Sequence, residues 1–299
     1  MYNIIIPVVY RDYSFLTKTI KYVCQNLNPK TIFIVTDGKM AQYIPKGVRN
    51  NTKCRIVDEN NVIDGLTYRK INTIIKSQER EHTNTGWFFQ QFLKMAFALS
   101  KYCDEDYYLS WDADTIPLQK ISFFDEYGAP YFTMKTEYHK PYFDSIKKLL
   151  NLDKLNPRSY IAEHMLFKKE IMIEMIDAIE HSSVAGNTWY EKIMNSIVPE
   201  VISTDSFSEF ETYGTYCKSY YPDLYKERQI PGFRKAALIQ GRFVSEKILK
   251  KLSDDVFIAS FEIYDRPPFP WSIICNWYET IRKQKELLII KYFYVVDKK

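Results

Sequence analysis

The sequence predicts an α/β fold in which a mainly parallel central sheet is flanked by helices. In the first half of the chain, short runs of β-branched and aromatic residues alternate with longer amphipathic segments. This alternation requires crossover connections, which pair strands in parallel. Polar residues directly follow several of the short runs, at the strand ends where parallel sheets bind ligands.

Composition limits the class of protein. The chain has 299 residues, 46% of them hydrophobic and 26% charged, which is typical of a globular protein with a full core. The high aromatic content of 16% favours grooves lined by rings. The sequence shows no signal peptide and no apolar run long enough to span a membrane. Its five cysteines form no CxxC pair, so we expect reduced thiols in a cytoplasmic protein. A net charge of +4 without a dense basic block argues against a nucleic-acid partner.

The first half contains six predicted elements. In chain order they are a strand at 3–9, a helix with Asp12 as its N-cap, strands at 31–35 and 54–57, a helix with Thr85 as its N-cap, and a strand at 107–111. Asp37 follows the second strand, Asp58 the third and Asp112 the fourth. We expect these side chains to meet at one edge of the sheet.

The second half is less regular. It predicts strands at 130–134, 164–168 and 255–264, and helices at 169–180, 187–197, 207–221 and 243–252. Neither repeats nor a low-complexity linker divides the chain. The sequence therefore favours one domain with a helical C-terminal appendage.

Two aspartates in the stretch YYLSWDADTIPL directly follow a predicted buried strand. Asp112 and Asp114 repel each other unless a cation lies between them. Mg²⁺ and Mn²⁺ are commonly held by one or two carboxylates together with substrate phosphates. The pair therefore predicts a Mn²⁺ or Mg²⁺ site, although two aspartates in a turn can also simply cap the following segment.

Two other classes of function remain open. WDADTI resembles the nucleophile motif of haloacid-dehalogenase-type phosphatases, in which Asp112 would form an aspartyl-phosphate. Ile116, however, stands where that family has threonine or valine, and more than one hundred residues precede the motif. A non-catalytic glycan-binding module would keep an aromatic groove and need no metal.

Four stretches in order, GWFFQQFLKMAFAL, YYLSWDADTIPL, AEHMLF and SEFETYG, resemble glycosyltransferases of the GT-A type. They are closest to a poorly characterised family from polysaccharide-biosynthesis clusters, and the resemblance covers about residues 2–240. It implies a Rossmann-like catalytic domain at 1–240 with residues 241–299 packed on it as an extension. It also implies a nucleotide-sugar donor, a divalent metal and a glycan or lipid-linked glycan acceptor.

The resemblance assigns the metal-site residues. Asp112 would face the donor ribose or its metal, and Asp114 would be the firmer metal ligand. His164 in AEHMLF resembles a histidine that serves as a further metal ligand in such enzymes. The structural alternative for His164 is a buried histidine that hydrogen-bonds to its surroundings.

Two overlapping capping boxes, Ser206 with Glu209 and Ser208 with Glu211, mark the start of a helix. One glutamate would close the helix, and the other would be free to point into a cleft. Inverting transfer needs a carboxylate base for the acceptor hydroxyl. We predict Glu209 as this base and Glu211 as the second candidate; a retaining mechanism would not need it.

The donor site is predicted from polar residues near the same strand ends. Gln91 and Lys94 lie one helical turn apart, so amides can bind sugar hydroxyls while the lysine neutralises the diphosphate. Trp87 either stacks on a sugar ring or belongs to the core. Further donor contacts are predicted at Pro7, Val9, Arg11, Asp37, Asp58, Arg69 and Asp112.

The C-terminal stretch WSIICNWYETIRKQK has the pattern of an amphipathic helix. It predicts either a helix docked on the domain or peripheral contact with a membrane surface. The membrane alternative would suit a lipid-linked acceptor.

Overall fold

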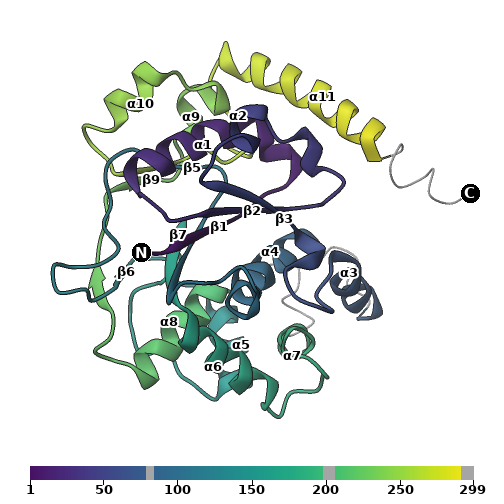
Figure 1. The fold of residues 1–299 in the computed structure, drawn as a ribbon, viewed down its shortest axis with the longest axis vertical. Coiled ribbons are helices and arrows are strands. Elements are labelled where there is room, and N and C mark those ends of the chain that lie inside the picture. The colour runs from purple at the N-terminus through teal and green to yellow at the C-terminus, as the bar shows by residue number, and fades with distance from the viewer. Residues whose placement is uncertain (79–83, 198–205, 291–299) are drawn as a thin grey trace, which may run out of the picture.

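A computed structural model describes residues 1–78, 84–197 and 206–290 (Figure 1). Its centre is a five-stranded sheet in the order β3-β2-β1-β4-β7. The strands are β1 (Asn3–Pro7), β2 (Ile32–Thr36), β3 (Cys54–Asp58), β4 (Tyr107–Trp111) and β7 (His164–Lys168). The first four are parallel, and β7 pairs antiparallel with β4. The predicted α/β fold with a mainly parallel sheet is confirmed.

Both faces of the sheet are covered, which explains why β1 and β2 are buried along their whole length and mostly apolar. One face packs against α1 (Tyr13–Asn26), through residues such as Leu16 and Ile20. The other face packs against a large helical layer (Figure 1). Its members are α3 (Tyr68–Ser77), α4 (Thr85–Ala96), α5 (Lys140–Leu150), α6 (Lys169–Glu180), α7 (Trp189–Ser196) and α8 (Glu209–Tyr220).

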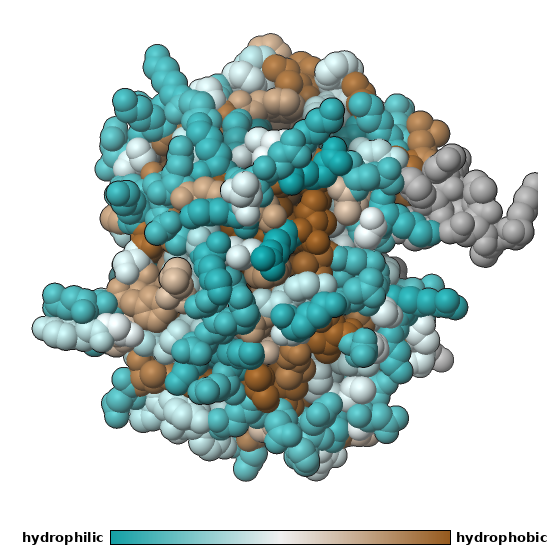
Figure 2. All heavy atoms as spheres, viewed as in Figure 1, coloured by the Kyte–Doolittle hydropathy of each residue, from teal (hydrophilic) through white to brown (hydrophobic). Residues whose placement is uncertain are grey.

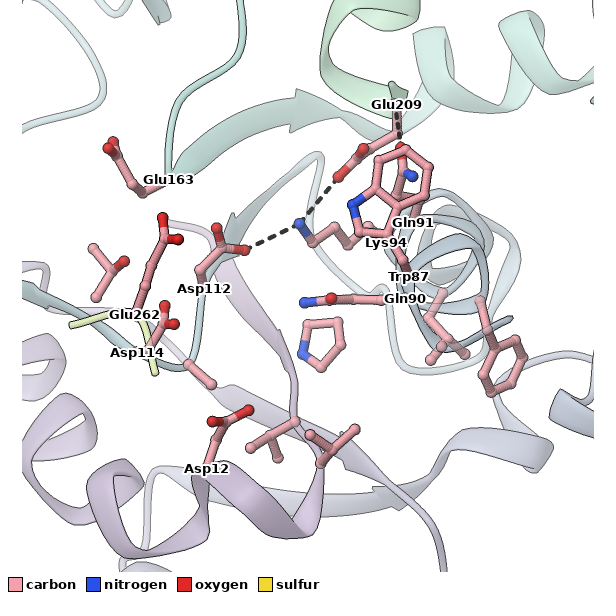
Figure 3. Close-up of a pocket in the computed structure, with 18 of the residues that line it drawn as sticks. Asp12, Trp87, Gln90, Gln91, Lys94, Asp112, Asp114, Glu163, Glu209 and Glu262 are labelled. Atoms are coloured by element: carbon pink, nitrogen blue, oxygen red, sulfur yellow. Dashed lines mark hydrogen bonds and ion pairs between the residues drawn. The ribbon is translucent and has the colours of Figure 1, made fainter. Parts of the chain in front are cut away.

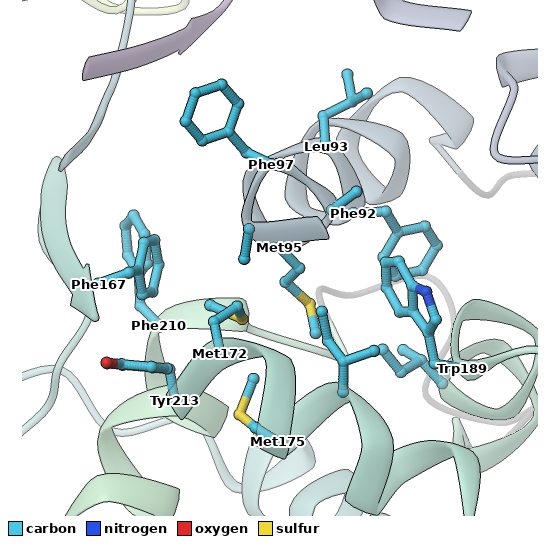
Figure 4. Packing of buried hydrophobic residues seen from close by; sticks show 14 of the residues in the cluster. Phe92, Leu93, Met95, Phe97, Phe167, Met172, Met175, Trp189, Phe210 and Tyr213 are labelled. Atoms are coloured by element: carbon cyan, nitrogen blue, oxygen red, sulfur yellow. The ribbon is translucent and has the colours of Figure 1, made fainter. Parts of the chain in front are cut away.

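The helical layer contains the larger core. Figure 4 shows Phe92 and Met95 of α4 meeting Met172 and Met175 of α6 and Trp189 of α7. The rings of Phe92 and Trp189 meet edge to face, with centroids 5.4 Å apart. This packing fixes α4 beneath the sheet and thereby sets the direction of its polar side chains.

A second, smaller sheet brings the end of the chain beside the Asp-x-Asp pair. It has the order β5-β10-β9, with β5 (Thr115–Pro117), β10 (Ile258–Ser260) and β9 (Gly232–Phe233). β10 runs antiparallel to β5, and the Phe261 N–H donates to the Asp114 carbonyl at 2.9 Å. Residues beyond 240 therefore help to hold the metal-site loop predicted from the sequence.

The remaining elements complete the described chain. Two short strands, β6 (Tyr131–Thr133) and β8 (Lys226–Arg228), form a separate pair. The short helices α2 (Lys46–Arg49), α9 (Ala237–Gln240) and α10 (Glu246–Leu252) and the long α11 (Trp271–Ile290) lie on the α1 side of the sheet (Figure 1). No helix in the described ranges is long and apolar enough to cross a membrane.

Several local predictions were wrong. The first strand ends at Pro7, and the late strand covers only 258–260. Asn84, not Thr85, caps α4, since its side chain accepts from the Trp87 N–H. Asp12 stands at the N-cap position of α1 but makes no capping bond, because Arg242 holds its carboxylate. The helices α3 and α5 were not predicted.

Candidate active site

A cavity of about 530 Å³ lies at the carboxyl ends of β1 and β4. These strands are neighbours at the centre of the sheet, and the strand order runs outward from them in opposite directions. Such a switch point is where open α/β sheets bind ligands. The cavity is lined by the residues after β1, by α4, by the Asp-x-Asp turn, by residues 161–163, by the start of α8 and by residues 260–264.

Most of the residues predicted to form a site line this one cavity. They are Pro7, Val9, Arg11, Gln91, Lys94, Asp112, Asp114 and Glu209, together with Gln90 and Trp87 (Figure 3). Asp37, Asp58, Arg69, His164 and Glu211 are not among the lining residues. The structure thus brings together residues from β1, α4, β4 and α8, as the sequence pattern predicts.

Lys94 connects two of these elements at the floor of the cavity. Its side chain is buried and its Nζ lies 3.1 Å from Asp112 Oδ1 and 3.0 Å from Glu209 Oε1 (Figure 3). Burial opposes the charge, but Asp112 and Glu209 outweigh it and hold the pKa of Lys94 above its ordinary value. The backbone N–H of Glu209 donates to Gln91 Oε1 at 3.0 Å. Together these contacts join the start of α8 to α4.

Acidic side chains dominate the lining. Eight carboxylates face three basic groups, an excess of five negative charges when all are ionised. Burial raises the pKa of Asp114 to about 7, with further contributions from Asp12, Asp112 and Glu262, although Arg242 opposes the shift. Arg242 lies 2.5 Å from Asp12 but 3.5 Å from Asp114. Arg242 therefore neutralises the charge of Asp114 less well than that of Asp12.

The donor set fits a hard divalent cation. Figure 3 shows the carboxylates of Asp112 and Asp114 on the same side of the cavity, with Glu262 beside them. Within the described ranges there is no group of three or more His, Cys, Asp or Glu residues arranged to hold a metal ion. Two carboxylates plus substrate phosphates are, however, the usual ligands of Mg²⁺. Asp112 and Asp114 are the residues that would hold it.

The two glutamates of the capping boxes have different surroundings. Ser208 caps α8 by accepting from the Glu211 N–H at 3.2 Å. The Glu211 carboxylate is buried and accepts from Ser159 Oγ at 2.6 Å and the Tyr160 N–H at 2.9 Å, and it lies 3.2 Å from Lys154 Nζ. Glu211 therefore anchors the chain at 154–160, away from the cavity, which does not support it as a second base. Glu209 lines the cavity.

His164 lies in the core and does not support the prediction of a metal ligand. It is stacked on Trp111, with ring centroids 5.1 Å apart, and its Nε2 is 3.0 Å from Thr133 Oγ1. Burial, together with Arg228 and Lys135, lowers the pKa of His164 to about 3 and keeps it neutral. Its neighbour Glu163 lines the cavity instead. Successive residues in an extended chain point to opposite sides, and the inward one is the glutamate.

Two other predicted donor contacts close turns. Asp37 Oδ1 accepts from the backbone N–H groups of Lys39 and Met40 at 2.8 and 3.0 Å. Asp58 accepts from the Asn60 N–H at 3.0 Å and caps a short 3₁₀ helix. The residue after it, Glu59, lines the cavity. Arg69 lies exposed on α3.

Glu59 should make the stability of the protein depend on pH. Burial and the carboxylates of Asp37 and Asp58 raise its pKa from 4.5 to about 8. Between these values the folded state holds a proton that the unfolded state has lost, so stability falls as pH rises. We expect the free energy of unfolding to fall between pH 4 and 9 by about 3 kcal/mol less in Glu59→Gln than in the wild type. Urea unfolding at several pH values measures this difference. The exposed Glu126→Gln is the control, and equal pH dependence in both variants would contradict the prediction.

Four further lining residues were not predicted from the sequence. Arg234, after β9, lies 3.3 Å from Glu262, after β10, and also pairs with Glu137. Tyr264 accepts a hydrogen bond from Arg11 at 3.1 Å. These contacts hold one wall of the cavity together from four segments that are distant in the sequence. The pairing of β10 with β5 and β9 brings Arg234, Glu262 and Tyr264 to this wall.

A family model described as a family of unknown function, DUF6492, matches residues 5–229. The chain belongs to this family. The DUF6492 match includes the Asp-x-Asp turn, α4 and the start of α8, and ends before Arg234, Arg242 and Glu262. No curated protein matches the chain.

Among solved structures, this DUF6492 chain has distant likenesses. One is the galactosyltransferase LgtC in complex with donor and acceptor sugar analogues, at a TM-score of 0.44 and 10% identity over 94% of this chain and 95% of that one. Another is mouse xyloside xylosyltransferase 1, at a TM-score of 0.45 and 10% identity over 89% and 99%. A third is the glycosyltransferase GlyE of Streptococcus pneumoniae TIGR4, at a TM-score of 0.43 and 9% identity over 93% and 63%.

Proposed function

We propose that this protein is a metal-dependent glycosyltransferase that moves a sugar from a nucleotide-diphosphate sugar to a glycan acceptor. The observation that supports the proposal best is the acid-rich cavity at the switch point of the sheet, with Asp112 and Asp114 among its lining residues. The acidic lining would repel a diphosphate unless a divalent cation lay between the carboxylates and the phosphates and neutralised the charge of each. A site of two carboxylates, completed by substrate phosphates, meets that need with Mn²⁺ or Mg²⁺.

The residues of the cavity have separate roles in this proposal. A bound metal supplies Lewis-acid stabilisation of the leaving diphosphate. Asp112 and Asp114 hold it, and Lys94 keeps Asp112 in place through their 3.1 Å contact. The buried Gln91 Nε2 has no hydrogen-bond partner among the described residues, so it is free to donate to a sugar hydroxyl. Trp87 lines the same wall and offers a ring for stacking.

Glu209 takes the proton of the acceptor hydroxyl. Burial raises its pKa, with a contribution from Asp112, against the opposing effect of Lys94. A carboxylate with a raised pKa is a better general base near neutral pH. The reaction would then proceed with inversion. The acceptor is a glycan of polysaccharide or glycoconjugate biosynthesis, free or lipid-linked, and the protein works on the cytoplasmic side.

Thermal melting with a panel of nucleotides and nucleotide sugars, with and without Mn²⁺, tests the function. We expect a rise in melting temperature with one nucleoside diphosphate that requires Mn²⁺ and is lost in Asp114→Ala. No shift with any nucleotide would overturn the proposal. Release of phosphate from simple phosphoesters, with phosphate trapped on Asp112, would indicate the phosphatase. Glycan binding that is metal-independent and intact in Asp114→Ala would indicate a binding module.

Glu209→Gln separates catalysis from binding. The amide keeps the size of the side chain but cannot accept the proton, so we expect turnover to fall about a hundredfold. The nucleotide-dependent shift in melting temperature should remain. Glu180→Gln, at an exposed position at the end of α6, is the control. Unchanged turnover in Glu209→Gln would exclude this residue as the base and favour a retaining mechanism.

A further inference from the structure

The helix α11 exposes an apolar face to solvent. Ile273, Trp277 and Leu288 are 60%, 68% and 67% exposed. Spacings of four and eleven residues correspond to about one and three helical turns, so the three side chains point the same way. Ile274 and Leu287 are also exposed, and they widen the face. Figure 2 shows apolar residues along the upper right edge of the molecule, where Figure 1 places this helix.

The opposite face of α11 is charged and turned toward the protein. Arg282 is only 8% exposed. Its guanidinium lies 2.9 Å from Glu279 and 2.6 Å from Glu286. Tyr278 packs edge to face on Phe243, with ring centroids 5.2 Å apart. A helix of a globular protein ordinarily buries its large apolar side chains, whereas α11 buries Arg282 and Cys275 and leaves several large apolar side chains exposed.

The charges of the outward half of α11 are all positive. Both glutamates of the helix pair with Arg282, whereas the exposed Lys283 and Lys285 have no acidic partner among the described residues. Their helical positions, about 160° apart, place one lysine on each side of the apolar face. An apolar strip flanked by lysines matches an anionic bilayer, into which interfacial helices insert one face.

The apolar surface extends beyond the helix. Of the twenty large apolar residues that are exposed in the described part of the chain, ten lie between Leu238 and Ile290. Phe269, just before α11, is 78% exposed. Six of these ten residues belong to α11, so the exposed apolar side chains are concentrated on this helix.

We propose that α11 is a membrane-docking surface that binds anionic phospholipid bilayers through Ile273, Trp277 and Leu288, with Lys283 and Lys285 at its flanks. A second copy of the chain fits less well. A twofold axis through the middle of the helix would bring the lysines of the two copies together, and like charges oppose such an interface.

The docking surface is adjacent to the cavity. Arg11 lines both the cavity and the cleft beneath α11, which is also lined by Arg242 and Tyr278. The side of α11 that faces the protein is therefore connected to the wall of the proposed site. The docking itself does not depend on the proposed function.

Sedimentation of the full chain with vesicles tests the proposal. We expect binding to vesicles of phosphatidylcholine and phosphatidylglycerol, weaker binding to phosphatidylcholine alone, and loss of binding as salt rises. Trp277→Ser should lower the partition coefficient about tenfold. Lys283→Gln and Lys285→Gln should each lower it about fivefold on the anionic vesicles. Tyr127→Ser, an exposed aromatic position in the loop before β6, should bind as the wild type does.

Two results would overturn the proposal. One is the absence of binding to anionic vesicles, or equal binding by the wild type and Trp277→Ser. The other is a dimer in solution that Trp277→Ser dissociates, without vesicle binding, which would make the face an interface between copies. Because Trp277 is mostly exposed, its replacement should leave the melting temperature unchanged, and this separates lost docking from unfolding.

Discussion

Asp114→Asn is expected to lower the rate of sugar transfer about a thousandfold, because it removes a charge from the proposed metal site while keeping the shape of the side chain. Burial and three neighbouring carboxylates already make the ionised form of Asp114 costly. We therefore expect the metal-free variant to be no less stable than the wild type. If the rate of transfer falls while the stability of the metal-free protein does not, the fall is due to the proposed metal site and not to unfolding. The measurements are transfer with the donor that the melting panel identifies, and melting without metal.

The control is Asp106→Asn. Asp106 is exposed and precedes β4, at the other end of the strand that leads to Asp112. The Asp106→Asn variant should have the activity and the stability of the wild type. Wild-type activity in Asp114→Asn at saturating Mn²⁺ would contradict the proposed metal site.

Lys94→Met is expected to destabilise the protein by about 3–5 kcal/mol, because it leaves two carboxylates in the cavity floor without their cation. Lys94 lies 3.1 Å from Asp112 and 3.0 Å from Glu209, and its ammonium group also lies 4.6 Å from the centre of the Phe210 ring. Methionine fills most of the same volume, so the loss would come from the charge. Urea unfolding measures it.

A second substitution should partly reverse this effect. In Lys94→Met the Glu209 carboxylate has lost its cation, and adding Glu209→Gln replaces that carboxylate with a neutral amide. We therefore expect the double variant to be more stable than Lys94→Met alone. Lys101→Met, at an exposed position just after the α4 region, is the control and should change stability little. A loss in Lys94→Met no larger than that of the control would show that the ion pairs contribute little to stability.

The sequence predicted the centre of the candidate site because of where polar residues follow strands. Asp112 and Asp114 follow β4, and Pro7 ends the neighbouring strand β1. Gln91 and Lys94 share one face of a helix that packs below these strands. Strand ends and helix spacing are local features, so they can be read before the fold is known. The two capping boxes marked the start of α8 but did not themselves distinguish Glu209 from Glu211.

The errors arose where the same signal serves two purposes. Asp37 and Asp58 also follow strands, but their side chains accept hydrogen bonds from the next backbone N–H groups. Aspartates after strands often close turns in this way. Glu59, one residue further on, is the side chain that lines the cavity. Nothing in the sequence distinguishes a capping carboxylate from its cavity-facing neighbour.

Long-range pairing was outside the reach of sequence reasoning. Arg234 and Glu262 enter the wall of the cavity only because β10 inserts between β5 and β9. Three-residue strands carry no periodicity that could predict this arrangement. Arg242 reaches Asp12, 230 positions earlier in the chain, and no pattern in either segment indicates it.

The insertion of β10 sets the order in which the cavity can be completed during synthesis. A ribosome releases the Asp-x-Asp turn and β5 long before residues 258–260, so the nascent chain carries an unpaired β5 edge until β10 emerges. The carboxylate cluster also lacks Glu262 throughout that interval, and it lacks Arg242 for most of it. A polypeptide halted before residue 258 would hold the family-matched segment and α8, yet it would lack a finished cavity.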